Sequence, residues 1–495
     1  MYSVINGFMK ILLISPNIKG MEGGVNRIQP PLGIAYLSAY LSKEHEVIIY
    51  DTAIEGWNNQ ISLGNQIISI GESDSAIEQK IRSIKPDVVG ISILFGNLMD
   101  SALNIAKICK QVSPTIQVVC GGNYITNVIR DWQTNIRSGL FYSSDIDYYF
   151  VGEADIAFLE FLKSTNKKKS PGICFFFDDR LVVNEPSPFM NLSNGLDPMW
   201  ELFDMEKYFS VGLSHSAQSY SPRVLPVMAS RGCPEKCQFC TTPQTWGSSV
   251  RWKDTYKLYL EMSRFISKYQ IGEIQFQDDT ITAHLPKLYQ LCEYIKEFKL
   301  PWCTPNGIKL NYHTPKQSEM FTKMKESGCY QVTLACESGV QRVLDNIVRK
   351  NLQVNQFKPS IQRAKDAGLM VHTFWIVGFP GETREEMERT IEIASECGAD
   401  SFSVSILTPL PGTSIYRKVI TENLWWDNSH GPNSALFRKS LVQVDGFDSP
   451  ESFENWVDAQ NLFLNDLLGN LDPKRYQSII AGRGLKVQDR RIKQT

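Results

Sequence analysis

Three cysteines fall within eight residues of the stretch SRGCPEKCQFCTTP, residues 230–243. Cys233, Cys237 and Cys240 are spaced C-x3-C-x2-C. Thiolates this close together favour soft metals or iron–sulfur clusters. A structural zinc site normally has four ligands, and no fourth cysteine or histidine lies near this loop. Three ligands would leave one iron of a four-iron cluster open to an outside molecule. Buried free cysteines without a cluster are the weaker alternative at this spacing.

Further candidate residues stand where apolar, strand-like segments end. From residue 223 onward, six such segments are each followed by a helix-like segment, which predicts a partial (β/α)6 barrel with its site at the carboxyl ends of the strands. These segments are 223–230, 273–279, 302–310, 331–339, 370–383 and 401–413. The polar or glycine residues at their ends are Asp278, Asp279, Asn306, Glu337, Ser338 and Gly378 of GFPGE.

The first third of the chain also alternates strands and helices. Apolar strands are expected at 10–15, 46–51, 87–93 and 116–122, with one more inside 145–164. Such alternation predicts a doubly wound parallel sheet covered on both faces, with ligands bound beyond the carboxyl ends of its strands. The candidates at those ends are Ser92, Gly121, Gly122, Asn123, Gly152 and Glu153. A tight turn explains the two adjacent glycines equally well.

A chain of 495 residues is expected to form more than one domain. We expect an α/β domain at 1–165, a linker with a hairpin at 166–222, the barrel at 223–420, and a C-terminal region at 421–495. That last region should contain a helix over 449–471 and a basic tail. The net charge of -2 does not support a general nucleic-acid binder, and the longest apolar runs are too short to span a membrane. With sparse cysteines and no leader, we expect a cytoplasmic protein.

The cysteine motif, with Phe239 as the aromatic in C-x3-C-x-aromatic-C, resembles the signature of radical S-adenosylmethionine (SAM) enzymes. The resemblance implies a [4Fe–4S] cluster on the three cysteines, SAM on the fourth iron, and a 5′-deoxyadenosyl radical as the product of its cleavage. It also implies roles for the strand-end residues. Phe239 and Gly378 would lie near the adenine, Asp278 and Asp279 at the amino group of SAM, Glu337 and Ser338 at the ribose, and Asn306 facing the site. Helix caps and turns are the alternatives for the aspartates, Gly378 and Asn306.

Joined to this barrel, the first domain resembles the cobalamin-binding domain of cobalamin-dependent radical SAM enzymes. The resemblance covers the chain to about residue 420 and includes PPLGIAYLSAYL, CGGNYIT and VGEAD. It implies that the strand-end residues of the first domain hold cobalamin, although Glu153 could equally cap a helix. No D-x-H-x-x-G stretch is present, and His45 is the only histidine in residues 1–165. We therefore expect base-off cobalamin without a histidine ligand.

The resemblance implies a methyltransferase. The 5′-deoxyadenosyl radical would take hydrogen from an unactivated carbon (or phosphorus) of a small molecule, and methylcobalamin would supply the methyl group. Flavodoxin or ferredoxin would supply electrons. A non-methylating oxidative cyclisation or rearrangement is the alternative. Methylthiotransferases carry a second cluster on three N-terminal cysteines, but Cys109, Cys120 and Cys174 are poorly placed to converge. A non-catalytic iron–sulfur module fits the complete barrel pattern less well.

Overall fold

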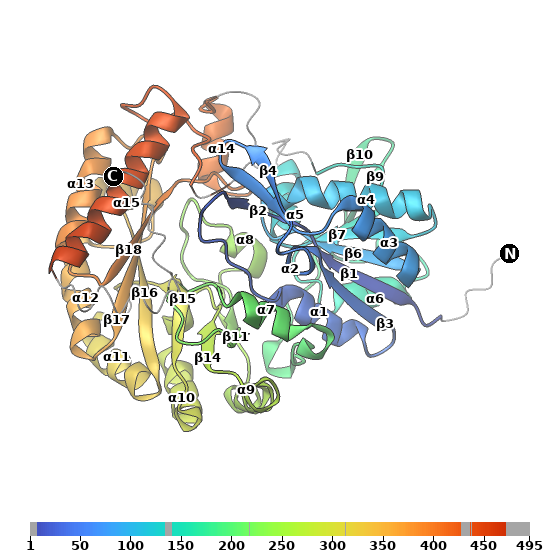
Figure 1. Cartoon of the computed structure of the whole chain (residues 1–495), viewed down its shortest axis with the longest axis horizontal. Helices are drawn as coiled ribbons and strands as arrows, with labels where there is room; N and C mark the ends of the chain where they lie inside the picture. Colours follow the sequence, from blue (N-terminus) through green and yellow to red (C-terminus); the bar gives the residue numbers. More distant parts are fainter. Residues whose placement is uncertain are drawn as a thin grey trace.

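The computed structural model describes residues 7–133, 141–216, 218–311, 313–426, 436 and 438–471. It contains two large sheets, one in each half of the chain (Figure 1). The first has seven strands in the order β10-β9-β8-β7-β6-β1-β3. Its parallel strands, all predicted, are β1 (Lys10–Ser15), β3 (Glu46–Asp51), β6 (Val88–Ser92), β7 (Gln117–Gly121) and β8 (Tyr148–Phe150).

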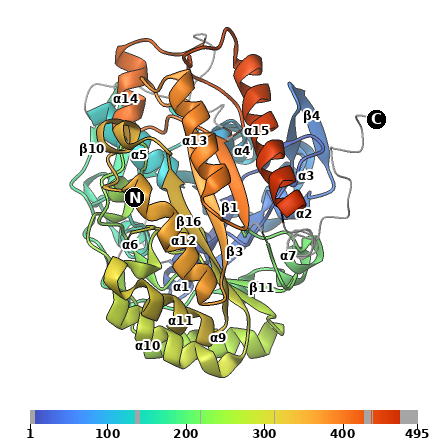
Figure 2. The same cartoon turned by 90° about the vertical axis from the view of Figure 1, so that its left-hand side faces the viewer.

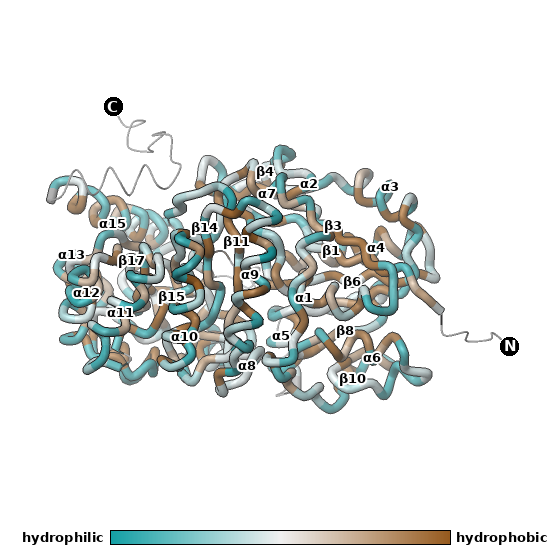
Figure 3. The backbone as a smooth tube through the Cα atoms, turned by 90° about the horizontal axis from the view of Figure 1, so that it is seen from below, coloured by the Kyte–Doolittle hydropathy of each residue, from teal (hydrophilic) through white to brown (hydrophobic). Residues whose placement is uncertain are grey.

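Both faces of this sheet are buried, as the alternation of strands and helices predicts. Along β1, Ile11 and Leu13 belong to one hydrophobic cluster, while Leu12 and Ile14 belong to another. Because successive side chains of a strand point to opposite faces, each face has its own core. Figure 3 shows these strands as hydrophobic segments between the helices. The helices are α1 (Leu32–Leu41), α2 (Thr52–Glu55), α3 (Asp74–Ile84), α4 (Met99–Val112), α5 (Asn123–Gln133) and α6 (Ala157–Lys163).

The predicted hairpin forms, but it extends this sheet. Strands β9 (Ile173–Phe177) and β10 (Arg180–Val183) are antiparallel, and β9 pairs with β8. Asp178 and Asp179 make the turn at φ 48° and 58°. Two consecutive residues with positive φ are typical of the tight turn that matches the twist of a hairpin. The hairpin therefore belongs structurally to the first sheet, and the domain boundaries themselves stay a prediction.

A small antiparallel sheet was not predicted. It consists of β2 (Ile18–Met21), β5 (Ile67–Ile70) and β4 (Gln60–Gly64). Every residue of β4 is exposed, so this strand lacks the apolar pattern that would have identified it.

The second half forms the predicted partial barrel, a six-stranded parallel sheet in sequence order. Its strands are β11 (Val224–Val227), β14 (Glu273–Phe276), β15 (Trp302–Ile308), β16 (Cys329–Glu337), β17 (Met370–Val377) and β18 (Ser401–Ile406). Its helices are α9 (Thr255–Tyr269), α10 (Leu285–Ile295), α11 (Gln317–Glu326), α12 (Phe357–Asp366) and α13 (Arg384–Glu396). The remaining elements are α7 (Met205–Val211), β12 (Ser230–Arg231), α8 (Thr242–Trp246), β13 (Arg251–Trp252), the π-helix Val343–Val348 and α14 (Ser414–Thr421).

The predicted C-terminal helix is α15 (Pro450–Leu471), which lies beside α13 (Figure 2). Asn461 on α15 donates to the carbonyl of Val404 and accepts from its N–H, both at 2.9 Å. The helix therefore satisfies backbone groups on the edge strand β18 and covers this edge of the open barrel. The predicted basic tail lies outside the described residues. Within the described part of the chain, no helix has both the length and the apolarity needed to cross a bilayer.

Candidate functional site

The three motif cysteines differ from the other eight in their exposure. Cys233, Cys237 and Cys240 are half-buried, whereas all the others are fully buried. They lie in one loop after β12, residues 232–241, which we call the cluster loop. The N–H of Cys240 donates to the carbonyl of Cys237 at 3.2 Å. Burial raises the pKa of all three thiols, and that of Cys233 reaches about 11.

The donor set of the cluster loop fits an iron–sulfur cluster. Three cysteines in one short loop bind as thiolates, and a positively charged iron–sulfur centre stabilises that deprotonated form. Among the described residues, no three Cys, His, Asp or Glu side chains converge on a point where one metal ion would sit. A cluster does not require such convergence, because each thiolate binds a different iron.

Asp278, predicted at the amino group of SAM, holds the start of the cluster loop. Its carboxylate accepts from the N–H of Ala229 at 3.0 Å, and from the N–H and hydroxyl of Ser230 at 2.6 and 2.5 Å. The side chain is fully buried, and burial raises its pKa to about 7. These contacts make Asp278 a support of the segment that leads into the cysteines.

Asp279 supports the next residues. It accepts from the N–H of Gly232 at 3.2 Å and from the hydroxyl of Thr242 at 3.0 Å. Gly232 has φ 100°, and a Cβ there would overlap the carbonyl oxygen of Ser249. Only glycine fits this position, which directly precedes Cys233. The sequence contains a glycine before the first cysteine, but nothing local shows that the backbone needs it.

Glu337, predicted at the ribose, ends β16 with φ 65° and forms a buried ion pair with Lys350. Lys350 also donates to the carbonyl of Ala335 at 3.3 Å. Burial raises the pKa of Cys237, and the Lys350 ammonium opposes that rise. Lys350 was not predicted because only the folded chain brings it to the cluster loop.

Ser338 is fully buried, and its hydroxyl lies 3.2 Å from that of Thr390 on α13. Asn306 is exposed near the end of β15, and its side-chain amide donates to the carbonyl of Gln277 at 2.7 Å. Asn306 therefore lies at the end of the neighbouring strand, next to the aspartate pair. The buried side-chain amide nitrogen of Gln277 has no hydrogen-bond partner among the described residues.

The stretch GFPGE lies beside the cluster loop. The rings of Phe239 and Phe379 are 5.9 Å apart between centroids. Glu382 accepts from the N–H groups of Gly378 and Phe379 at 2.9 and 3.1 Å, which closes the turn. Gly378 has φ 86°, and a Cβ there would lie 2.8 Å from the ring of Phe453. The structure thus brings together the two segments that the resemblance assigns to the adenine.

In the first domain, the candidate residues gather at the carboxyl edge of the parallel strands. Ser92 ends β6, Gly121 ends β7, and Asn123 begins α5. Gly122 has φ 106°, and a Cβ would overlap the carbonyl of Ile93, so a tight turn explains it. Gly152, by contrast, has φ 84° and open space where a Cβ would be. An approaching ligand would therefore meet bare backbone at Gly152.

Glu153, predicted near the corrin, contacts the barrel. Its carboxylate pairs with Arg231 at 3.3 Å and with Arg251 at 2.6 Å, and it accepts from the N–H of Met190 at 2.8 Å. His45 lies at the amino end of β3, where its ring accepts from the N–H of Met9 at 3.4 Å. That is the opposite edge of the sheet from the candidate site, so His45 is not placed to bind cobalt there.

Cys109, Cys120 and Cys174 lie in the core of the first domain. All three are fully buried in one hydrophobic cluster, on α4, β7 and β9 respectively. Burial raises the pKa of each thiol well above its ordinary value. Such thiols behave as small apolar side chains of the core.

Two family models match the chain, the radical SAM superfamily over residues 227–394 and the B12 binding domain over residues 23–162. The cytidylyl-2-hydroxyethylphosphonate methyltransferase of Streptomyces wedmorensis is 31% identical over 477 residues, covering 89% of this chain and 86% of that protein. The anaerobic magnesium-protoporphyrin IX monomethyl ester cyclase of Rubrivivax gelatinosus is 24% identical over 429 residues, covering 83% and 70%.

The fold also matches a solved structure, that of the cobalamin-dependent SAM radical enzyme OxsB with aqua-cobalamin and SAM bound. The TM-score is 0.68 at 13% identity, and the match covers 96% of this chain and 74% of that one. The two family models, radical SAM and B12 binding, give the cofactors of this protein as a [4Fe–4S] cluster, SAM and cobalamin. Together with the three-cysteine loop and the two sheets, these matches show that the chain belongs to the cobalamin-dependent radical SAM enzymes of the methyltransferase type.

Proposed function

We propose that this enzyme transfers a methyl group from methylcobalamin to an unactivated carbon, or phosphorus, of a small molecule. The observation that carries the proposal is the direct contact between the loop 151–155, a candidate cobalamin site, and the segment that leads into the cluster loop. The loop 151–155 of the first domain forms buried ion pairs with Arg231, two residues before the first cluster cysteine. A domain interface built this way supports two cofactors that act on one substrate between them.

When bound, the cluster supplies the electron that cleaves SAM to a hydrogen-abstracting radical, and cobalamin supplies the methyl group. The chain's own residues hold and shield these groups. Cys233, Cys237 and Cys240 would ligate the cluster, and Phe239 and the GFPGE turn would flank the adenine. The buried ion pairs between the domains would keep water from the space between the two cofactors.

The substrate is proposed to be a small polar molecule. Gln277 and Thr408 follow β14 and β18, and each has a buried polar side-chain atom without a partner in the described part of the chain. A buried polar atom of this kind is stabilised when a ligand hydrogen-bonds to it. Because the relative from Streptomyces wedmorensis acts on cytidylyl-2-hydroxyethylphosphonate, a cytidylylated phosphonate is the first substrate to test.

Two further parts of the proposal concern the cell. Reduction of the cluster would require a low-potential electron donor, for which flavodoxin or ferredoxin is proposed. Eleven free cysteines are compatible with a reducing compartment, so the cytoplasm is the proposed location.

A non-methylating cyclisation is the second candidate, because the cyclase from Rubrivivax gelatinosus matches 83% of this chain. One experiment separates the two reactions. Anaerobically reconstituted enzyme is supplied with cobalamin, a reductant, the candidate substrate and SAM that carries a trideuterated methyl group, and the products are analysed by mass spectrometry. Methyl transfer predicts a product with the trideuteromethyl group, absent with Cys237→Ala. A product that has lost hydrogen and carries no label would refute methyl transfer.

A further inference from the structure

A cluster of four charged side chains, three of them buried and the fourth half-buried, joins the two halves of the molecule. It comprises Glu153 and Asp155 from the first domain and Arg231 and Arg251 from the barrel, and we call it the interdomain ion-pair cluster. Arg231 donates to both oxygens of Asp155, at 3.0 and 3.2 Å. Arg251 donates to both oxygens of Glu153, at 3.1 and 2.6 Å. A guanidinium nitrogen of Arg231 also lies 3.3 Å from a carboxylate oxygen of Glu153, which links the two pairs.

Burial makes this cluster depend on the docked arrangement. Arg231, Glu153 and Asp155 are only 4%, 6% and 7% exposed. Two positive and two negative charges balance, so the desolvation of each is offset by its partners only while the domains are together. If either side moved, buried charges would lose their partners. The interdomain ion-pair cluster therefore specifies one relative placement of the two loops that carry it.

Each side of the interdomain ion-pair cluster is attached to a candidate cofactor loop. Glu153 directly follows Gly152, the position where a ligand would meet bare backbone. Arg231 ends β12 and stands two residues before Cys233. Arg231 and Arg251 are register partners between β12 and β13. The turn before β13 holds the cluster loop as well, because the carbonyl of Gly247 accepts from the N–H of Cys233 at 3.4 Å.

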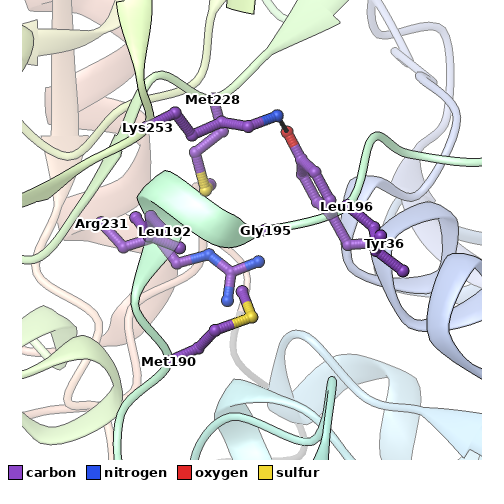
Figure 4. A pocket seen from close by; sticks show the side chains of 8 residues that line it. All are labelled: Tyr36, Met190, Leu192, Gly195, Leu196, Met228, Arg231 and Lys253. Carbon is purple, nitrogen blue, oxygen red and sulfur yellow. Dashed lines mark hydrogen bonds between the residues drawn. The ribbon is translucent and has the colours of Figure 1, made fainter. Parts of the chain in front are cut away.

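The guanidinium of Arg231 is also fixed by aromatic rings. It lies 5.3 Å from the ring of Tyr36 on α1 and 4.8 Å from the ring of Trp246 on α8. Figure 4 shows Arg231, Tyr36 and Lys253 around the same small pocket between the domains. Lys253 donates to the hydroxyl of Tyr36 at 3.4 Å. A planar, bidentate group held in this way cannot be replaced by lysine without loss of geometry.

We propose that Arg231 is a positioning residue that couples the two cofactor sites. Cobalamin bound at the loop 151–155 would stabilise the position of Asp155 and Glu153, and through Arg231 the position of Cys233. Cobalamin and the iron–sulfur cluster would then bind cooperatively, and each would strengthen the binding of the other by the same factor. The proposal goes beyond methyl transfer, since it holds whichever reaction the substrate undergoes.

The test is a spectroscopic titration with hydroxocobalamin, made on anaerobic protein with and without a reconstituted iron–sulfur cluster. It gives the ratio of the two cobalamin dissociation constants, without and with the iron–sulfur cluster. We expect tighter cobalamin binding when the cluster is present, by about 5–150-fold, the usual range of coupling between sites. Arg231→Lys should reduce the ratio of the cobalamin dissociation constants, without and with the iron–sulfur cluster, to near one. Asp155→Asn is the second variant, because it leaves the pair between Glu153 and Arg251 intact and preserves side-chain size.

Glu261→Gln is the matched control. Glu261 is buried and pairs with Lys253 at the same interface, but no hydrogen bond or ion pair joins it to the loop 151–155 in the described structure. It should keep the wild-type ratio. A wild-type ratio of one, or a wild-type ratio retained in both Arg231→Lys and Asp155→Asn, would overturn the proposal. The titration needs no substrate, so coupling can fail here while methyl transfer is still observed.

Discussion

Replacing Asp278 by asparagine tests whether this buried carboxylate holds the cluster loop. In the structure it accepts three hydrogen bonds from Ala229 and Ser230. The carbonyl oxygen of asparagine can keep the two bonds from Ser230, but its amide group would then face the N–H of Ala229. Two donors would oppose each other in a buried site.

The cost follows from these contacts. A buried donor left without a partner costs about 1–3 kcal/mol. Part of this is offset, because burial raises the pKa of Asp278 to about 7 and the carboxylate is itself costly to bury. A net loss of about 2 kcal/mol corresponds to a factor of about 30 in the fraction of molecules whose cluster loop is open.

The assay is the rate at which an iron chelator removes the cluster under anaerobic conditions. Asp278→Asn should lose its cluster about 30 times faster than the wild type if removal follows the open fraction. Asp51→Asn is the matched control, because Asp51 is also buried and accepts from Ala53, Ile54 and Tyr208, but in the first domain. A wild-type rate in Asp278→Asn, together with weaker SAM binding, would refute the loop-holding role and favour contact with SAM.

Three other comparisons of variants have defined outcomes. Gly122→Ala and Gly152→Ala both put alanine at a positive φ, a strain of about 1–3 kcal/mol each. Gly122→Ala should lower the melting temperature more, because only its Cβ also overlaps backbone atoms. Burial raises the pKa of Glu382 from 4.5 to about 8, so the folded state binds a proton that the unfolded state releases. Stability should therefore fall as the pH rises from about 4.5 to about 8, and Glu382→Gln should show a flatter dependence in urea unfolding. Lys350→Met should shift the reduction potential of the cluster to more negative values in a redox titration, because a nearby positive charge is lost, whereas Lys350→Arg should not.

Much of the fold was accessible from the sequence, because strands buried on both faces form continuous apolar runs. All parallel strands of both large sheets lie where KILLIS, DVVGISI, QVTLACESG and similar stretches predict them. The cysteine motif was equally accessible, since its chemistry depends on local spacing. The hairpin turn was identified from Asp178 and Asp179, although its place in the first sheet was not.

The supports of the site were not accessible, because their partners lie far apart in the chain. Arg231 and Asp155 are 76 residues apart, and Arg251 and Glu153 are 98 apart. An arginine or a glutamate at such positions has no local pattern that distinguishes it from a solvent-exposed charge. Glu153 illustrates the consequence: its position at a strand end favours a ligand contact, but it does not reveal that the carboxylate pairs with two arginines of the barrel.

The most direct test of this account is electron paramagnetic resonance of the reduced, anaerobically reconstituted protein, before and after addition of SAM, with iron and sulfide analysis of the same sample. Three cysteine ligands and one open iron predict about four irons per chain and a cluster signal that changes when SAM binds. Cys233→Ala should lose that signal and bind cobalamin with the affinity of the cluster-free wild type. Zinc in place of iron, or a cluster signal that SAM leaves unchanged, would contradict the account.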